Sequence, residues 1–175
     1  MPTPPKGTKR YKEWRRRYEP EVAKLIIVAE SPPISGLYLY NPDGSVSEPL
    51  FAALMKALGL SPTTKASGLR ALQQRGWVLV DSTYEPVNEL SGTARNAVIR
   101  RDYPLLRDDL AGLTQGRAVP LVLIKANVCR LLESSLVADG FHVLNGGRKI
   151  YFPANGWQGD FQRQFADVLR SAETE

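Results

Sequence analysis

Residues 25–33, L-I-I-V-A-E-S-P-P, pass without a break from an apolar run into a polar segment that contains prolines. The β-branched run at residues 24–29, bounded by polar residues, predicts a buried strand. The following residues, 30–42, bring a carboxylate, prolines that stiffen the backbone, and Gly36, which permits close approach of another group. A plain connector does not need this chemistry. We therefore expect the segment to form one wall of a pocket.

Strands and helices alternate along the rest of the chain. Further strands are predicted at residues 77–81, 121–125, 141–144 and 148–152, the last two joined as a hairpin by Asn145-Gly146-Gly147. Apolar residues at helical spacing predict helices at residues 50–58, 64–75, 104–115, 128–138 and 159–170. Residues 81–101 are expected to be irregular. The alternation predicts an α/β fold, a three-layer α/β/α sandwich around a mostly parallel sheet.

The bulk composition limits the class of protein. With 175 residues and 43% apolar residues, the chain fits one globular domain. We expect a flexible leader at residues 1–10 and a single α/β domain at residues 11–175. The apolar runs are too short to span a bilayer, and no secretory signal is visible. One cysteine, Cys129, and one histidine, His142, offer no metal cluster. We expect a cytoplasmic monomer without a metal or other cofactor and without a membrane partner.

The N-terminal region concentrates positive charge. The net charge is +5, and residues 6–18 hold seven cations: Lys6, Lys9, Arg10, Lys12, Arg15, Arg16 and Arg17. Tyr11, Trp14 and Tyr18 would share one face of a helix at this spacing. Arg15, Arg16 and Arg17 are candidate contacts to nucleic-acid phosphates. A solvated basic face with a packed aromatic stripe is an equal alternative, and charge alone does not separate nucleic acid from membrane lipid.

Polar residues follow several of the predicted strands. In a parallel α/β sheet, ligands bind beyond the carboxyl ends of the strands. Four segments would therefore meet at one rim: residues 30–33, 81–83, 125–127 and 152–158. No glycine-rich phosphate loop and no G-x-S-x-G nucleophile elbow occurs in the sequence.

The order of these segments resembles the uracil-DNA glycosylase superfamily over residues 24 to 170. Residues 29–33, A-E-S-P-P, are similar to the family's G-Q-D-P-Y or G-E-A-P-G motif after the first strand. Residues 76–81, G-W-V-L-V-D, resemble G-V-L-L-L-N, and Phe152-Pro153-Ala154-Asn155 takes the place of H-P-S-P. The resemblance implies a sandwich with a parallel sheet, DNA as partner, and a base flipped out of the helix and excised. Trp157 would be the wedge that compensates for unstacking.

Three departures from that pattern bear on activity. Ser31 stands where the family commonly activates water, and Phe152 cannot donate a hydrogen bond to a departing base. Asp81 replaces the base-reading asparagine, and an ionised carboxylate only accepts hydrogen bonds. It would favour a base edge that presents donors, such as the amine of cytosine, by about 1–3 kcal/mol. These departures argue against ordinary uracil excision.

The remaining candidates each have a structural alternative. Glu30 is the candidate acid–base residue, because a carboxylate stabilises oxocarbenium character or orients water; it could instead cap a helix or bind backbone amides. Asp81 could be a structural carboxylate at a turn. Tyr38 and Tyr40 could stack a base or form a half-buried strand. Asn127 fits a helix N-cap, and Trp157 could pack on the last helix. Further candidate base-binding residues are Ser31, Pro32, Phe152, Pro153 and Asn155.

Three functions remain open on the sequence alone. The first is a divergent glycosylase that binds DNA and excises a modified base by hydrolysis of the N-glycosidic bond. The second is a catalytically inactive module of the same fold that binds nucleic acid or a nucleotide. The third is an unrelated α/β enzyme that acts on a small anionic substrate.

Overall fold

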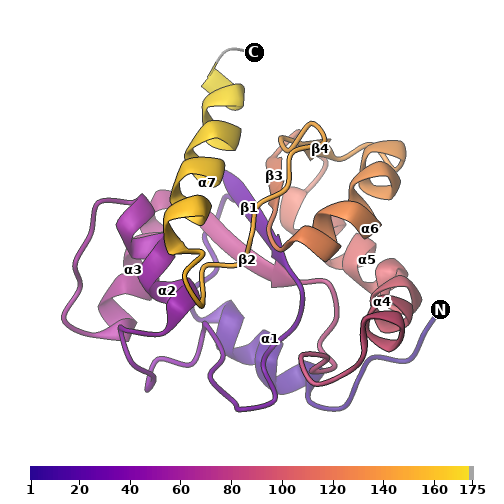
Figure 1. The fold of residues 1–175 in the computed structure, drawn as a ribbon, viewed down its shortest axis with the longest axis horizontal. Helices are drawn as coiled ribbons and strands as arrows, with labels where there is room; N and C mark the ends of the chain where they lie inside the picture. Colours follow the sequence, from indigo (N-terminus) through magenta and orange to yellow (C-terminus); the bar gives the residue numbers. More distant parts are fainter. Residues whose placement is uncertain (174–175) are drawn as a thin grey trace.

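A four-stranded parallel sheet forms the centre of the molecule (Figure 1), which is described by a computed structural model for residues 1–173. Its strands are β1 (Leu25–Ala29), β2 (Trp77–Asp81), β3 (Pro120–Leu123) and β4 (His142–Val143). Their order in space is β2-β1-β3-β4, with Leu25 opposite Trp77 and Ile26 opposite Leu121. All three strand pairs are parallel. The carboxyl ends of the strands therefore share one edge, as the sequence predicts.

Helices cover both faces of the sheet, which gives three layers. One apolar cluster joins the face that carries Ile27 and Leu79 to helices α1 (Thr8–Arg16), α2 (Pro49–Ala57), α3 (Lys65–Arg75) and α7 (Gln158–Glu173). A second cluster joins the opposite face, with Ile26 and Val28, to α4 (Gly92–Arg101), α5 (Tyr103–Thr114) and α6 (Ala126–Ala138). In Figure 1 α2, α3 and α7 lie to the left of the strands and α4, α5 and α6 to the right, while α1 lies below them. The predicted α/β sandwich around a parallel sheet is confirmed.

Local sequence signals account for several element ends. Thr64 and Ser91 precede α3 and α4, and their hydroxyls accept hydrogen bonds from the backbone N–H groups of Ser67 and Ala94. Such N-caps satisfy donors that have no partner inside the helix. Gly76 ends α3 with a φ of 82°, a left-handed conformation that glycine adopts without a steric penalty. The chain then enters β2 directly.

Three sequence predictions about local structure are wrong. The basic helix begins at Thr8, so residues 8–10 belong to it and not to a leader. Residues 92–101 form helix α4 instead of an irregular connector, because Ser91 provides the cap. The predicted hairpin at residues 141–152 is absent from the described residues, since β4 is parallel to β3 and residues 148–152 form no strand.

Asn145 replaces the expected hairpin pairing. It is fully buried. Its amide oxygen accepts a hydrogen bond from the N–H of Leu123 at 2.8 Å, and its amide nitrogen donates one to the C=O of Leu123 at 3.0 Å. The same amide donates to the carbonyl of Arg148 at 3.0 Å. One side chain thus continues the edge of β3 in place of a strand. The segment that follows is free to run back over the carboxyl ends of the sheet.

No helix in the described part of the chain has the length and apolarity needed to cross a bilayer. Cys129 is buried in the second apolar cluster, where its thiol lies 3.3 Å from the carbonyl oxygen of Leu123. Burial raises the pKa of this thiol. Cys129 is therefore a core residue.

Candidate functional site

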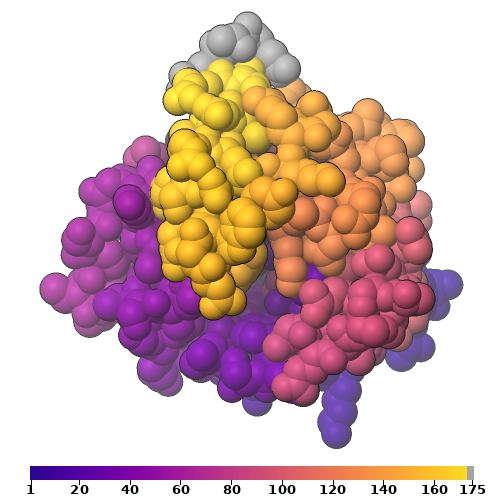
Figure 2. Space-filling model, in the orientation of Figure 1, coloured from indigo at the N-terminus to yellow at the C-terminus, as the bar shows by residue number. Residues whose placement is uncertain are grey.

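A cavity of about 440 Å³ opens at the carboxyl ends of the strands. Its lining includes Glu30 after β1, Asp81 at the end of β2, Lys125 after β3, and Phe152 and Asn155 from the segment before α7. Parts of the chain far apart in sequence therefore border one space. Figure 2 shows purple, pink, orange and yellow segments of the chain, which are far apart in sequence, side by side on one face of the molecule. We call this space the rim cavity.

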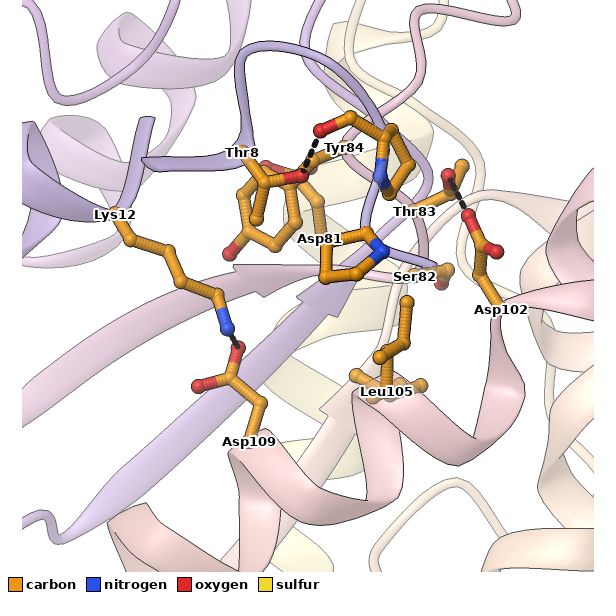
Figure 3. A pocket seen from close by; sticks show the side chains of 12 residues that line it. Thr8, Lys12, Asp81, Ser82, Thr83, Tyr84, Asp102, Leu105 and Asp109 are labelled. Atoms are coloured by element: carbon orange, nitrogen blue, oxygen red, sulfur yellow. Dashed lines mark hydrogen bonds and ion pairs between the residues drawn. The ribbon is translucent and has the colours of Figure 1, made fainter. Parts of the chain in front are cut away.

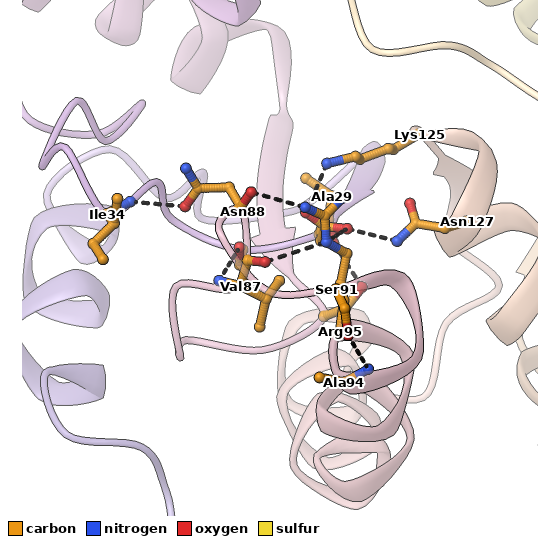
Figure 4. A network of polar contacts seen from close by, with 12 residues as sticks. Ala29, Ile34, Val87, Asn88, Ser91, Ala94, Arg95, Lys125 and Asn127 are labelled. Carbon is orange, nitrogen blue, oxygen red and sulfur yellow. Dashed lines mark hydrogen bonds and ion pairs between the residues drawn. The ribbon is translucent and has the colours of Figure 1, made fainter.

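Glu30 is the centre of a buried polar network in the rim cavity. Its side chain is 5% exposed, and its oxygens accept hydrogen bonds from Lys125 Nζ at 2.7 Å and Asn127 Nδ2 at 2.5 Å. Arg95 Nε lies 3.8 Å from the second oxygen. Figure 4 shows Lys125 and Asn127, at the start of α6, and Arg95, on α4, approaching the same point. Glu30 thus binds side chains, and the predicted cap or backbone-amide role is not what the structure shows.

Lys125 occupies an unusual backbone conformation at the start of α6. Its φ of 77° and ψ of 128° are rare for a residue with a side chain. Its N–H donates to the carbonyl of Ile150 at 2.7 Å, and its ammonium is held by Glu30. Conformations of this kind cost about 1–3 kcal/mol and gather at functional sites. Lys125 lines the rim cavity, and its ammonium lies 6.0 Å from the centre of the Phe152 ring.

Asn127 is placed differently from the sequence prediction. Lys125, not Asn127, is the N-cap residue of α6, and Asn127 lies one residue inside the helix. Its amide nitrogen is used by Glu30, whereas its side-chain oxygen is buried without a hydrogen-bond partner among the described residues. The N-cap interpretation is therefore wrong.

Asp81 is buried and lines both the rim cavity and the small hollow beneath the N-terminal residues. Alternation along β2 places its side chain on the same face as Leu79, which also lines the cavity. The residue is 4% exposed, and one carboxyl oxygen has no hydrogen-bond partner among the described residues. Desolvation raises the pKa of Asp81 to about 8, with Arg15 opposing and Asp109 and Glu30 adding to the rise. The side chain is mostly protonated at neutral pH, so the sequence-based treatment of Asp81 as an ionised acceptor is wrong.

Tyr38 and Tyr40 do not form a strand with one accessible face. Both are buried; residues 37–38 have no regular secondary structure, and residues 39–40 lie in a turn. Tyr38 contributes to the wall of the rim cavity, while its ring contacts Tyr11 with 4.9 Å between centroids. Tyr40 packs in the core, and its hydroxyl accepts the N–H of Leu79 at 2.8 Å. This contact satisfies a donor on edge strand β2, and it leaves Tyr40 unable to stack a base.

Arg15 is not part of a basic outer face. It is 3% exposed, donates to both carboxylate oxygens of Asp109 at 2.7 and 2.8 Å, and donates to the Tyr84 hydroxyl at 2.6 Å. Figure 3 shows Lys12 of the same helix reaching Asp109. The phosphate-contact prediction for Arg15 is wrong, because its charge is satisfied internally. Arg16 and Arg17 are exposed.

The hollow beneath the N-terminal residues is too small for a ligand. Figure 3 shows Thr8 of α1 above residues that follow β2, among them Ser82 and Thr83. The enclosed volume is about 40 Å³, close to the space that one water occupies. Thr83 donates to Asp102 at 2.7 Å there. The contacts at this place fasten α1 and α5 to the end of β2.

Other predicted residues divide between two hollows. Ser31 and Pro32 line the rim cavity, and the Ser31 hydroxyl accepts the N–H of Val87 at 3.4 Å. Phe152 and Asn155 line the rim cavity and an adjoining groove. Pro153 is buried and belongs to neither lining as described. Trp157 lines the groove only, and it is 47% exposed against Tyr151 instead of packed on α7.

Sequence reasoning missed three residues that shape this site. Arg95 donates to the carbonyls of Val87 and Asn88, besides facing Glu30. Asn88 lines the rim cavity and accepts the N–H of Ile34, which fixes the proline segment. Arg130 is exposed and lines the groove. Arg95 and Asn88 lie in the stretch expected to be irregular, and no motif distinguishes them in the sequence.

Comparisons with known proteins assign no family to this chain. No protein-family model matches this chain, and a search of curated proteins finds no match. Among the described residues, no group of three or more His, Cys, Asp and Glu side chains is placed to hold a metal ion.

Proposed function

We propose that this chain is a divergent uracil-DNA glycosylase-like protein that binds DNA, admits a flipped modified base to the rim cavity and hydrolyses its N-glycosidic bond. The observation that carries the proposal is the meeting of Glu30, Asp81, Lys125 and the 152–155 segment around one cavity. Its volume of about 440 Å³ lies within the range of small-molecule sites, about 300–1,000 Å³. Its walls combine apolar side chains with a few polar groups, which suits a planar heterocycle.

Asp81 would read the base edge. Protonated, it offers one O–H donor and one carbonyl acceptor, whereas an ionised carboxylate offers acceptors alone. Its buried oxygen without a partner supports a role in binding a polar ligand atom. We therefore expect preference for a base edge that presents a neighbouring acceptor and donor. This replaces the donor-only edge expected from an ionised Asp81.

Glu30 and Lys125 would share the chemistry. Water adds to the sugar carbon C1′ as the N-glycosidic bond breaks, and the bonding electron pair leaves with the base. Glu30 would stabilise the oxocarbenium character at C1′ and orient the water. The Lys125 ammonium, close to the Phe152 ring, would stabilise negative charge on the departing base in place of the missing donor at Phe152. The water proton passes to the departing base or to solvent.

An inactive binding module is the second candidate, and a specific observation favours it. Both oxygens of Glu30 are already engaged, one by Lys125 and one by Asn127. A carboxylate held in this way could serve only to position Lys125 and to keep the cavity open. Binding would then occur without bond cleavage.

The test is an excision assay on oligonucleotides that each carry one modified base. Deaminated, oxidised and alkylated bases are compared in single and double strands, and abasic product is detected by alkaline strand cleavage. We expect at least one substrate to be cleaved, with a loss of about 100-fold or more for Glu30→Gln, in the range typical of acid–base groups. Glu21→Gln, an exposed carboxylate before β1, is the matched control and should retain activity.

Two results would count against the enzyme. If no modified base yields an abasic site while the oligonucleotides bind, the binding module is the function. If neither product nor binding is found at low salt, both candidates fail. Thermal unfolding of each variant separates a loss of chemistry from a loss of fold.

A further inference from the structure

A groove of about 440 Å³ adjoins the rim cavity and shares part of its wall. The shared residues are Lys125, Phe152, Ala154 and Asn155. A ligand that occupies the cavity and extends past Phe152 therefore enters this groove without crossing another element. Its position adds a second binding surface to the site proposed above.

The groove carries a surplus of positive charge. Arg95, Lys125 and Arg130 line it, and the described lining contains no carboxylate. Glu30 lies behind the wall and neutralises part of the charge of Lys125 and Arg95. The three cations and this one carboxylate together give a net charge of +2. Of the three cations, Arg130 is the exposed one. A surface of this kind attracts an anion such as a phosphodiester.

Two exposed aromatic rings also line the groove. Tyr151 is 38% and Trp157 47% exposed, and their ring centroids lie 4.7 Å apart with 35° between the ring planes. The turn before Trp157 uses Asn155 and Gly156 at φ values of 53° and 91°. Because Trp157 rests against Tyr151, the pair presents a stacking surface, not a single side chain that projects from a loop.

We propose that this groove binds single-stranded nucleic acid, with a base stacked on the Tyr151–Trp157 pair and the adjoining phosphate held by Arg130 and Lys125. The proposal deepens the function proposed above and rests on it for the nucleotide in the rim cavity. Basic grooves with aromatic stacking surfaces bind single strands without sequence preference, because every base has a π-face. In a duplex the faces of neighbouring bases are already stacked, so the pair would find no free face.

The test compares binding of a fluorescent dT12 strand with binding of the same strand in a duplex, at several salt concentrations. We expect the single strand to bind at least about 10-fold more tightly. Trp157→Ala should weaken dT12 binding about 5-fold or more, and Trp157→Phe should recover most of the loss. Arg130→Ala should weaken binding and reduce the slope of log K against log salt by about 0.7, as for one lost phosphate contact on a single strand.

Arg117→Ala is the matched control, because this exposed arginine precedes β3 at the opposite edge of the sheet. It should bind dT12 as the unmodified chain does. Equal or tighter binding of the duplex, or unchanged dT12 binding by Trp157→Ala and Arg130→Ala, would overturn the proposal. Equal competition by poly-glutamate would also overturn it and indicate an acidic protein partner.

The two proposals fail in different ways. Binding of dT12 requires no bond cleavage, so Trp157-dependent binding without any abasic product supports the groove and removes the enzyme. Abasic product that does not depend on Trp157 or Arg130 supports the enzyme and removes the groove.

Discussion

Helix α1 and the groove beside the rim cavity contain the same residue types, arginines and lysines among aromatic rings, but they use them in opposite ways. In α1, Arg15 is buried with its guanidinium bound to Asp109 and Tyr84, and Tyr11 packs in the core. In the groove, Arg130, Tyr151 and Trp157 are exposed. Partners supplied by the fold therefore decide whether a basic aromatic segment is structural or open to a ligand.

The comparison explains why the sequence pattern in residues 6–18 misleads. Its spacing gives the correct helix and the correct apolar face, but it does not reveal the carboxylate that meets Arg15. Asp109 lies on α5, 94 residues after Arg15 in the sequence. Only the packing of α1 on the end of the sheet brings the two together. The following changes test this division between the two regions, from the largest expected effect to the smallest.

Arg15→Ala should destabilise the protein most. The change leaves the Asp109 carboxylate, 9% exposed, and the Tyr84 hydroxyl without their buried partner. Breaking a buried pair from one side typically costs about 3–5 kcal/mol in the free energy of unfolding. Urea unfolding followed by circular dichroism measures this change. The stability of Arg15→Lys should lie between that of the unmodified chain and that of Arg15→Ala, because an ammonium cannot form the two-point contact with the carboxylate. A cost below about 1 kcal/mol for Arg15→Ala would show that Arg15 does not anchor α1.

Asp81→Asn should stabilise the protein increasingly as pH rises. The pKa of Asp81 is about 8 in the folded state, against 3.8 ordinarily, so the unfolded chain loses this proton first. Between these values the folded state binds more protons, and stability falls with rising pH. Asparagine cannot ionise and removes this penalty. The free energy of unfolding of the variant, relative to that of the unmodified chain, should rise by about 2–4 kcal/mol from pH 5 to pH 8.

Urea unfolding of both proteins at pH 5, 6, 7 and 8 gives the Asp81 comparison. Asp43→Asn, at an exposed turn, changes the net charge equally and serves as the control. A difference between Asp81→Asn and the unmodified chain that stays constant across this range would mean that Asp81 is ionised in the folded protein. The base edge proposed for the rim cavity would then change as well.

Tyr40→Phe should have an intermediate effect. The tyrosine hydroxyl accepts the N–H of Leu79 on the edge strand β2, at a position where Tyr40 is 1% exposed. Removing it leaves a buried donor without its acceptor, at a cost of about 1–3 kcal/mol. Thermal unfolding measures the loss, with Tyr151→Phe as a control at a residue that is 38% exposed. Equal stability of both variants would mean that water replaces the hydroxyl.

The sequence predicts the fold better than it predicts the site. The apolar periodicity and the polar residues that follow the strands predict the layers, the parallel strands and their common carboxyl edge. These features depend on properties that are repeated along each element. Side-chain partners depend on single residues that meet across the fold. The Asn145 amide that continues β3, the positive φ of Lys125 and the contact of Arg95 with Glu30 have no local signal. Burial likewise reverses the expected charge state of Asp81.

Arg16→Gln combined with Arg17→Gln should change stability least, by no more than about 0.5 kcal/mol, because both side chains are exposed. Neither residue lines the described groove, so dT12 affinity should fall less than in Arg130→Ala. Thermal unfolding and the salt dependence of dT12 binding measure the two effects. A larger loss of affinity than in Arg130→Ala would show that the strand runs over α1. The contrast between a structural α1 and a ligand-binding groove would then hold for Arg15 alone, since its neighbours would belong to the nucleic-acid interface.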